Sequence, residues 1–266
     1  MLSLMSLERP TARQVEHFRD LVFETVRAEL KARNFRSVLG TAWWLLDPLL
    51  MALLYFFITT VMFSYGGGRD FLLYIVIATV SWRWFSRCLD NGPMLITSYK
   101  GVLKQTNFPA FAVLAIFAVT ELTFFLFGLA VVEAVLLCCG VMPGASLVWL
   151  PLIVLVQLML SLGLMTILAV IGVFLRDVGH VTYLFTAVWF YLSPGIYPAS
   201  RIPPGLRWLY AFNPFATIFP AYESVLLRGR APDVAALLAW LAAGTILFCL
   251  SIRFFHEQRM KFYKLL

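Results

Sequence analysis

The side chains best suited to chemistry in this sequence are ionisable groups inside apolar stretches. Arg83 lies about 12 residues after Phe71, and Glu121 about 13 residues after Phe108, which at ~1.5 Å per helical residue places both near mid-membrane. A charged side chain at that depth costs at least ~2.5 kcal/mol unless it is paired or hydrated. We therefore expect both side chains to face the protein interior as candidates to pair with each other, either lining a polar path or joining two helices.

No motif in the sequence predicts catalysis, metal binding or nucleotide binding. The H-E-x-x-H, G-x-S-x-G and G-x-x-x-x-G-K-[ST] patterns are all missing. The four cysteines lie in or beside apolar blocks, without the spacing of a zinc site or a disulfide framework. We expect no catalytic residue, no metal ligand and no cofactor bound by this chain.

Long apolar blocks must position the buried charges. Hydrophobic residues make up 61% of the 266 residues and charged residues only 13%, and the mean hydropathy is +0.85. A helix needs ~20 apolar residues to cross a bilayer core. We predict an all-α integral membrane protein with six transmembrane helices, at Ala42–Ser64, Phe71–Cys88, Phe108–Val141, Leu147–Leu175, Val181–Ile196 and Val234–Phe255.

The distribution of Lys and Arg predicts the orientation of these helices. Of the 21 basic residues, 16 lie on the side shared by both termini and 5 on the other side, so the positive-inside rule places both termini in the cytoplasm. The predicted parts are a cytoplasmic segment over residues 1–41, a transmembrane domain over 42–256 and a cytoplasmic tail over 257–266. This topology accounts for the net charge of +7, and we expect no nucleic-acid partner.

The segment before the first predicted span has the pattern of an amphipathic helix. Its apolar residues recur at helical spacing, and charged residues occupy the other positions around the helix. Such a helix lies along a membrane surface with its apolar side toward the lipid. The residues on the apolar side are Val15, Phe18, Val22, Val26 and Leu30.

Two of the breaks between spans differ from ordinary loops. Residues 90–109 are moderately amphipathic and bracketed by proline, which predicts a short helix along the cytoplasmic surface. Residues 193–233 are apolar but contain seven prolines, so their pieces are too short to span. Irregular backbone at membrane depth must be covered by protein or water, and we predict two short re-entrant helices on the outer side. Salt bridges from Glu223 to Arg228 or Arg230 could hold them.

Three stretches, in this order and spacing, carry a resemblance to a known family. They are RSVLGTAWWLLDPLL at Arg36–Leu50, Arg176-Asp177-Val178, and LSPGIYPASRIPPGLRWLYAFNPF at Leu192–Phe215. Together they resemble the transmembrane subunit of ABC-2 type polysaccharide exporters, a group that moves O-antigen, capsule and teichoic-acid polymers outward.

The resemblance implies partners, a location and roles for particular residues. The chain would form a homodimer in the bacterial cytoplasmic (inner) membrane with two copies of a separate ATP-binding subunit, which would hold ATP and Mg. A lipid-linked polysaccharide would be the substrate, with membrane lipids and periplasmic or outer-membrane export proteins as further candidate partners. Contact with the ATP-binding subunit would involve Tyr99, Lys100, Lys104, Arg176 and Asp177. The outer gate would include Pro203, Trp208, Tyr210, Asn213 and Pro214.

Aromatic residues make up 16% of the sequence and offer surfaces on which sugar rings can stack. Trp and Tyr also gather at membrane interfaces as anchors, so each candidate has a structural alternative. Neighbouring aromatics on a helix diverge by ~100° and cannot both face one lumen. The candidates for a sugar path are Trp43, Trp44, Tyr55, Phe56, Trp189, Phe190 and Tyr191.

These features predict the channel-forming subunit of an ATP-driven exporter for a lipid-linked polysaccharide. The first alternative is an ABC-2 permease for a small drug or lipid. The second is a membrane-embedded enzyme that acts on lipid-linked sugars, for which clustered carboxylates would be expected. The acidic residues here are scattered along the chain, which favours the transport subunit.

Overall fold

The structure is a computed structural model that describes residues 12–35, 42–62, 68–105, 108–142, 144–197, 205 and 207–265, with side chains described for most of them. Over these residues the chain is helical, without a strand. The prediction of an all-α fold is therefore confirmed for the part of the chain described. The elements in order are α1 (Ala12–Phe35), α2 (Ala42–Phe57) continued by a π-helical turn (Ile58–Met62), α3 (Arg69–Ser98), α4 (Lys100–Gln105), α5 (Ala110–Cys138), a 3₁₀ turn (Ala145–Trp149), α6 (Leu150–Phe174), α7 (Val178–Leu192), α8 (Arg207–Ala211), α9 (Phe215–Leu226) and α10 (Val234–Leu265).

Three helical stretches in the described chain are long and apolar enough to cross a membrane. They are Ala110–Cys138, Ala145–Phe174 and Val234–Lys261. Shorter apolar helices cover Leu49–Val61 and Val178–Leu192. Helix α3 has 30 residues but carries Arg83, Arg87 and Asp90 beyond its apolar first part, and it is not one of the three. The predicted positions of apolar helices are confirmed to this extent, and the number of crossings remains a prediction.

The boundary predicted between the second span and a separate cytoplasmic helix is wrong. Helix α3 continues without a break to Ser98 and includes Pro93, so residues 90–98 belong to it rather than to a surface helix. Packing against α6 explains why the proline does not end the helix. A Cβ atom on Gly172 would lie 2.1 Å from the carbonyl oxygen of Pro93, so the two backbones touch at this point. Only the short α4 remains of the predicted surface helix.

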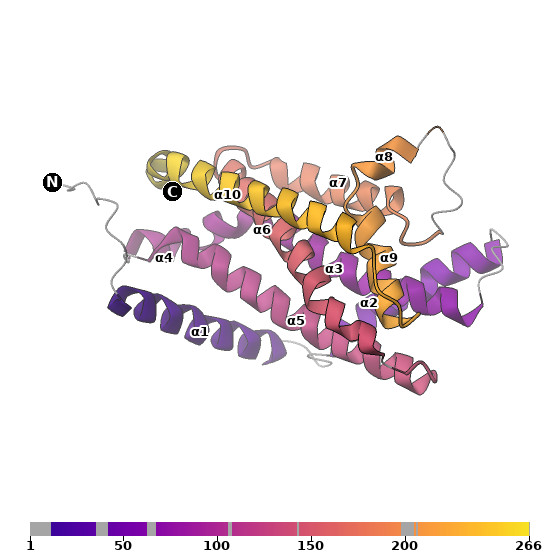
Figure 1. The fold of residues 1–266 in the computed structure, drawn as a ribbon. Coiled ribbons are helices and arrows are strands. Elements are labelled where there is room, and N and C mark those ends of the chain that lie inside the picture. Colours follow the sequence, from indigo (N-terminus) through magenta and orange to yellow (C-terminus); the bar gives the residue numbers. More distant parts are fainter. Residues whose placement is uncertain are drawn as a thin grey trace.

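Helix α6 lies at the centre of the fold and packs against α3 on one side and α10 on the other (Figure 1). Small residues permit the close approach of α10. A Cβ atom on Gly163 would lie 2.8 Å from Cγ of Leu247, and one on Gly244 would lie 3.2 Å from the backbone nitrogen of Leu160. Glycine at such crossings is typical of membrane helices, whose association depends on tight packing because lipid is as apolar as the side chains.

Helix α1 confirms the predicted helix, but its apolar side is covered by protein. It runs beside α5 (Figure 1), where Val26 is buried against Ala112 and Ile116. Phe23, on another side of α1, has 65% of its surface exposed. The apolar residues of α1 around this contact are Phe18, Leu21, Val22 and Leu30, and Val15 lies where side chains are not described.

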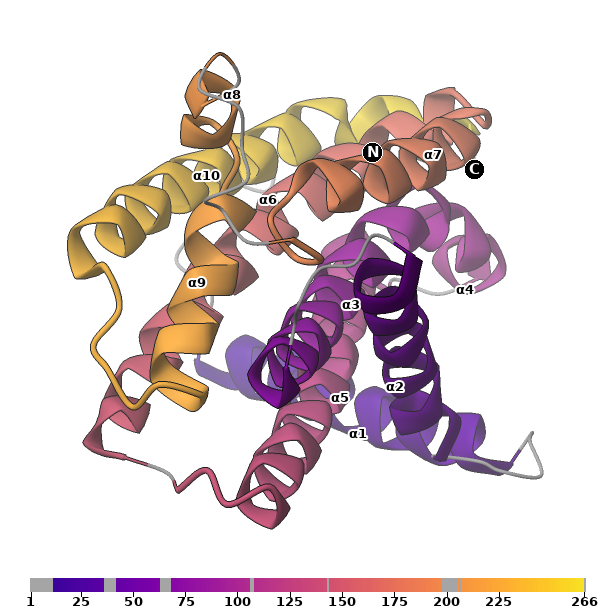
Figure 2. The ribbon, with the colours of Figure 1, turned by 90° about the vertical axis from the view of Figure 1, so that its right-hand side faces the viewer.

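The ends of the helices divide into two groups. The start of α1, α4 and the end of α10 lie at one end of the molecule, and α8 and α9 lie toward the other (Figure 1). Figure 2 shows α3 between α2 and α7, and α3 contacts both of them. Helix α3 therefore borders both α2 and α7. It carries the charged residues Arg83, Arg87 and Asp90.

Candidate functional site

A cavity of about 310 Å³ lies between α2, α3 and α7. It combines aromatic rings, hydroxyl groups and charges within helices that are otherwise apolar. The volume is at the lower end of the range of roughly 300–1,000 Å³ found for small-ligand sites. The residues that line it are Met51 and Tyr55 of α2, Thr79, Trp82, Arg83, Ser86 and Asp90 of α3, and Tyr183, Thr186, Ala187, Phe190 and Tyr191 of α7.

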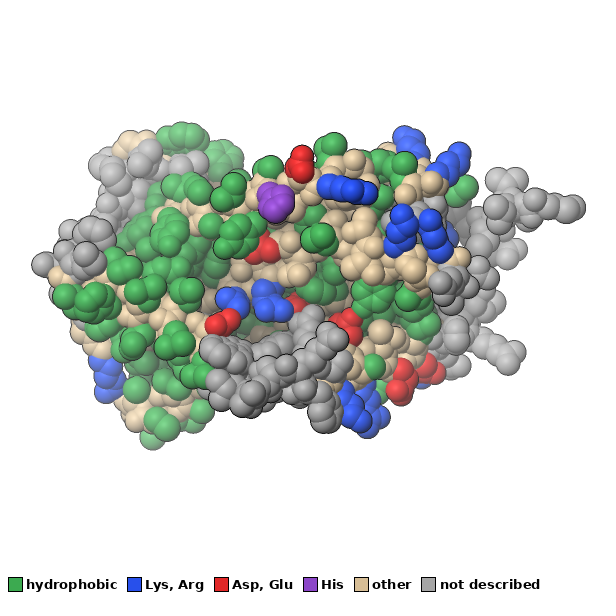
Figure 3. Space-filling view, turned by 180° about the vertical axis from the view of Figure 1, so that it is seen from behind, with side chains coloured by type: hydrophobic (Ala, Val, Ile, Leu, Met, Phe, Trp, Pro, Cys, Tyr) green, Lys and Arg blue, Asp and Glu red, His purple; other side chains and the backbone are tan. Residues whose placement is uncertain are grey.

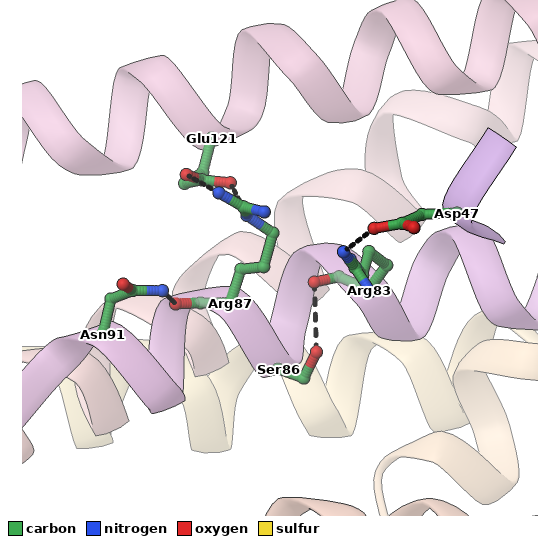
Figure 4. A network of polar contacts seen from close by, with 6 residues as sticks. All are labelled: Asp47, Arg83, Ser86, Arg87, Asn91 and Glu121. Atoms are coloured by element: carbon green, nitrogen blue, oxygen red, sulfur yellow. Dashed lines mark hydrogen bonds and ion pairs between the residues drawn. The ribbon is translucent and has the colours of Figure 1, made fainter. Parts of the chain in front are cut away.

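Charged hydrogen bonds connect α3 to both neighbouring helices at this cavity. Arg83 Nη2 donates to Asp47 Oδ2 of α2 at 2.5 Å, as Figure 4 shows. On the other side, Thr186 Oγ1 of α7 donates to Asp90 Oδ1 at 2.7 Å. The three helices around the cavity are therefore joined through the side chains that give it polarity.

A second ion pair joins α3 to α5, one helical turn from the first. Arg87 Nε donates to Glu121 Oε2 at 2.8 Å, and Arg87 Nη2 donates to Glu121 Oε1 at 3.4 Å (Figure 4). The Glu121 side chain is only 2% exposed, which confirms that it faces the protein interior. The pairing of Arg83 with Glu121 that we considered is wrong, because Arg83 faces α2 and Arg87 faces α5. Residue counting gives depth in a membrane but not the rotation of a helix about its axis.

Charged and hydrophobic side chains share one face of the molecule (Figure 3). In the space-filling view from behind, acidic and basic side chains lie next to one another in the middle of the face, with hydrophobic side chains over a broad area beside them (Figure 3). The side chains of the Asp47–Arg83 pair are 44% and 41% exposed. If lipid or another protein covers this ion pair, each charge still has an opposite charge beside it, which lowers the cost of an apolar environment.

Three of the predicted path aromatics meet at the cavity. The ring centroids of Tyr55 and Phe190 are 5.3 Å apart, and those of Tyr55 and Tyr191 are 6.2 Å apart with the rings perpendicular. Phe56 packs partly buried against the core. The side chains of Trp43 and Trp44 lie outside the described part of the structure.

Trp189 lies in an aromatic cluster formed by α3, α7 and α9. Its ring packs edge-on against Phe85 at 5.3 Å and against Phe215 at 6.2 Å. Its Nε1 donates to Asn213 Oδ1 at 3.2 Å. Trp189 thus packs within the protein, and its role in a path remains a prediction.

Asn213 is the predicted gate residue with the most defined role. Its Nδ2 donates to Ser193 Oγ at 2.9 Å, and its Oδ1 accepts from the backbone N–H of Phe215 at 3.0 Å. Together with the bond from Trp189, these contacts tie the end of α7 to the start of α9, which Pro214 precedes. The Tyr210 and Tyr197 hydroxyls hydrogen-bond to each other.

The remaining gate predictions are less constrained by the structure. Trp208 is 63% exposed, and Pro203 lies outside the described residues. The predicted salt bridge in this segment is confirmed, since Arg228 Nη2 donates to Glu223 Oε1 at 2.6 Å. This hydrogen bond to the carboxylate raises the pKa of Arg228, so the guanidinium stays charged.

The predicted contact residues for a partner lie at one end of the molecule. Lys100 and Lys104 of α4 are exposed, as are Arg176 and Asp177 in the turn before α7. Tyr99, between α3 and α4, donates a hydrogen bond from its hydroxyl to Glu29 of α1. The three segments α1, α4 and the turn before α7 are therefore available together for an interaction at this end.

One polar residue that the sequence analysis did not identify is Gln157 of α6, which is completely buried. Its Nε2 donates to the backbone oxygen of Ser81 at 2.8 Å, and its Oε1 accepts from Ser81 Oγ at 3.0 Å and from the Tyr222 hydroxyl at 3.2 Å. It thus joins α3, α6 and α9. The signal was available, since Gln157 is the one amide in an otherwise apolar helix.

Comparison with known proteins gives a consistent family. The family model described as ABC-2 type transporter matches residues 21–227. The O-antigen export system permease protein RfbA of Myxococcus xanthus is 30% identical over 252 residues, which cover 94% of this chain and 96% of that protein. Two Klebsiella pneumoniae proteins of the same name are each 25% identical over 248 residues, or 93% of this chain and 95% of each protein.

Proposed function

Because this chain belongs to the ABC-2 type transporter family, we propose that it is the channel-forming membrane subunit of an ATP-driven exporter for a lipid-linked polysaccharide, and specifically for O-antigen. One observation carries the proposal, namely end-to-end similarity to proteins named as O-antigen export permeases. The match covers more than nine-tenths of both chains, so it includes the whole set of helices rather than one shared segment.

The structure supports a particular topology for this subunit. In the proposal α2, α3, α5, α6, α7 and α10 cross the membrane, and both termini lie in the cytoplasm. Helix α1 lies at the cytoplasmic interface against α5, and α4 is the coupling helix that meets the ATP-binding subunit. Helices α8 and α9 are the re-entrant pair at the outer mouth. The positive charge of α4 and its position beside the start of α1 support this assignment of sides.

The proposed assembly contains two copies of this chain and two copies of an ABC ATP-binding subunit. Membership of the ABC-2 family supports the pairing with an ATP-binding subunit. ATP and Mg would be bound by that subunit, since this sequence has no phosphate-binding loop. The assembly would lie in the bacterial cytoplasmic membrane.

The cavity between α2, α3 and α7 is the proposed part of the polysaccharide path. Tyr55, Phe190 and Tyr191 supply aromatic surface there, and Asp90 and Thr186 supply hydrogen-bonding groups. Aromatic rings stack on the C–H faces of sugar rings without a fixed hydrogen-bond pattern, so a polymer could slide along them.

Two measurements test the proposal. Purification of the tagged chain from native membranes in mild detergent should recover an ABC ATP-binding subunit in equal amount, with ATPase activity. Deletion of this chain should leave long polysaccharide inside the cell and remove it from the surface, and re-expression should restore it. Normal surface polysaccharide in the deletion strain would contradict the proposal and favour a small drug or lipid as the substrate.

A further inference from the structure

A second cavity, of about 230 Å³, lies between α5, α6 and α10. Its wall is almost entirely hydrocarbon, and Thr166 of α6 carries the one hydroxyl group among its described lining residues. The cavity is a groove that reaches the surface, because Val119 is 43% exposed and Phe111 and Phe248 are half-buried. The three helices include the stretches that are long and apolar enough to cross a membrane, so the groove lies at membrane depth.

The length of this groove matches a lipid chain in one leaflet. Its lining on α5 runs from Phe111 to Leu122, which at about 1.5 Å per residue is about 16 Å along the helix. Half of a bilayer hydrocarbon core is about 15 Å thick. Phe111 is the second residue of α5 and Leu122 lies near its middle, so the groove covers the leaflet at the end where α5 begins. Helix α4 and the end of α10 lie at the same end of the molecule (Figure 1).

Basic side chains lie at the end of the groove where a lipid headgroup would be. Phe255 of α10 packs edge-on against Phe111, with 5.9 Å between the ring centroids, so this side of α10 faces the start of α5. Arg259 follows Phe255 by one helical turn and lies on the same side of α10, about 6 Å farther along it. The acidic residue of this segment, Glu257, is paired with Arg253. The exposed basic residues beyond Phe255 are Arg259, Lys261 and Lys264.

This combination matches an anionic phospholipid. An acyl chain in the groove would contact apolar side chains along its length, and a phosphate at the end of the groove would meet a guanidinium, which has five N–H donors in a planar fork. Each Lys or Arg close to a membrane surface strengthens the attraction of an anionic lipid about fivefold. A headgroup with an ammonium beside its phosphate has no net charge and gains less from the same residues.

We propose that the groove between α5, α6 and α10 binds one acyl chain of an anionic phospholipid of the bilayer, whose phosphate lies against Arg259. The bound chain fills the space that the side chains leave open and joins α5 to α10 across it. The site is separate from the cavity between α2, α3 and α7 and does not depend on which substrate is exported. Only its assignment to the cytoplasmic leaflet rests on the proposed topology.

The test uses the complex with its ATP-binding subunit in nanodiscs of equimolar dioleoylphosphatidylglycerol and dioleoylphosphatidylcholine. The complex is then transferred to mild detergent, and native mass spectrometry counts the lipids that stay bound. We expect one phosphatidylglycerol per copy of this chain, retained at least about tenfold over phosphatidylcholine because several basic side chains lie at the groove. Arg259→Gln should lower that preference about fivefold. A chain that purifies without an ATP-binding subunit would contradict the proposed function, and the same measurement would then be made on the chain alone.

Matched variants separate the groove from general attraction by positive charge. Ala118→Phe places a ring in the groove and should abolish the retained lipid, whereas Ala130→Phe, at an exposed position of α5 outside the groove, should not. Asp20→Asn makes the chain more positive at an exposed ion pair of α1 and should leave retention unchanged, as should Arg69→Gln at the start of α3. In the wild type, raising the salt concentration should reduce the preference for phosphatidylglycerol by screening. That measurement does not depend on whether the variants fold.

Three results would overturn the phospholipid site. The first is equal retention of the two lipids, or of neither, by the wild type. The second is wild-type retention in folded Arg259→Gln or Ala118→Phe, which would place the bound lipid elsewhere. The third is preferential retention of a polyprenyl phosphate added in equal amount, which would assign the groove to a different lipid. None of these results bears on the exporter assignment, which the deletion strain tests separately.

Discussion

Arg87 and Arg83 are one helical turn apart on α3, yet they bind carboxylates on different helices. Arg87 bonds to Glu121 of α5, whose side chain is 2% exposed, and Arg83 bonds to Asp47 of α2, whose side chain is 44% exposed. A pair that is buried on one side resists separation more than a pair open on both sides. The ion pair between α3 and α5 should therefore be harder to separate than the ion pair between α2 and α3.

Removing Arg87 should destabilise the protein more than removing Glu121. Arg87→Met takes the guanidinium hydrogen bonds from a carboxylate that is almost fully buried, which by analogy with broken buried pairs costs about 3 kcal/mol. Glu121→Gln leaves the charge on Arg87, which is 35% exposed and better solvated. Thermal unfolding of the purified complex should show the larger decrease for Arg87→Met.

The double variant provides the control for this pair. Arg87→Met combined with Glu121→Gln removes both charges together and should be more stable than Arg87→Met alone. Asp47→Asn, in the exposed pair, should lower stability by no more than about 1 kcal/mol. Additive losses in the double variant would show that the two side chains do not act as a pair.

Replacing the buried Gln157 should destabilise the contact of α3, α6 and α9. Gln157→Leu removes three hydrogen bonds and leaves the Ser81 and Tyr222 groups in an apolar interior, at a cost of about 1–3 kcal/mol. Tyr222→Phe removes only the 3.2 Å bond and should cost less. Thr245→Val removes a bond from an exposed side chain of α10 to the backbone of Leu241; it is the matched control and should change the melting temperature little.

Sequence reasoning located the helices because hydropathy reports directly whether a segment lies in lipid or in water. The predicted end of the second span was wrong near Pro93. Asn91, Gly92 and Pro93 together have the pattern that usually ends a helix. The helix continues there because the backbone of α6 at Gly172 lies against it, a contact between residues far apart in the chain. A prediction from neighbouring residues in the sequence cannot include a contact between residues 93 and 172.

In the polar site, burial could be predicted from the sequence but the pairing of side chains could not. Burial of Glu121 followed from the cost of a charge in an apolar helix, and the structure confirms it. Its partner could not be predicted, because Arg83 and Arg87 differ in direction by the rotation of α3, which packing decides. The roles of Asp90 and Asn213 likewise depend on which helices lie side by side.

Gly172→Ala should disrupt the crossing of α3 and α6. The added Cβ would meet the Pro93 carbonyl oxygen at 2.1 Å, and backbone on both sides leaves no flexible side chain to move away. Overpacking of a core typically costs about 1–3 kcal/mol, and we expect the upper end or beyond here. Gly101→Ala in α4 has nothing within 4 Å of the new Cβ and should be neutral or slightly stabilising. Equal melting temperatures for the two variants would contradict the close approach of the helices.

Asn213→Ala should loosen the outer segment while leaving the rest of the bundle folded. It removes the side-chain bonds to Trp189, Ser193 and the Phe215 backbone N–H, each typically worth about 1 kcal/mol. The described hydrogen bonds between the end of α7 and the start of α9 are made by this amide, beside the ring contact of Trp189 with Phe215. We expect faster hydrogen exchange confined to residues 207–226, with the exchange of α5 and α6 unchanged. If α8 and α9 close the outer mouth as proposed, the same variant in proteoliposomes should also leak a small neutral sugar, and Asp20→Asn should not. Unaltered exchange in residues 207–226 would show that contacts other than Asn213 hold this segment.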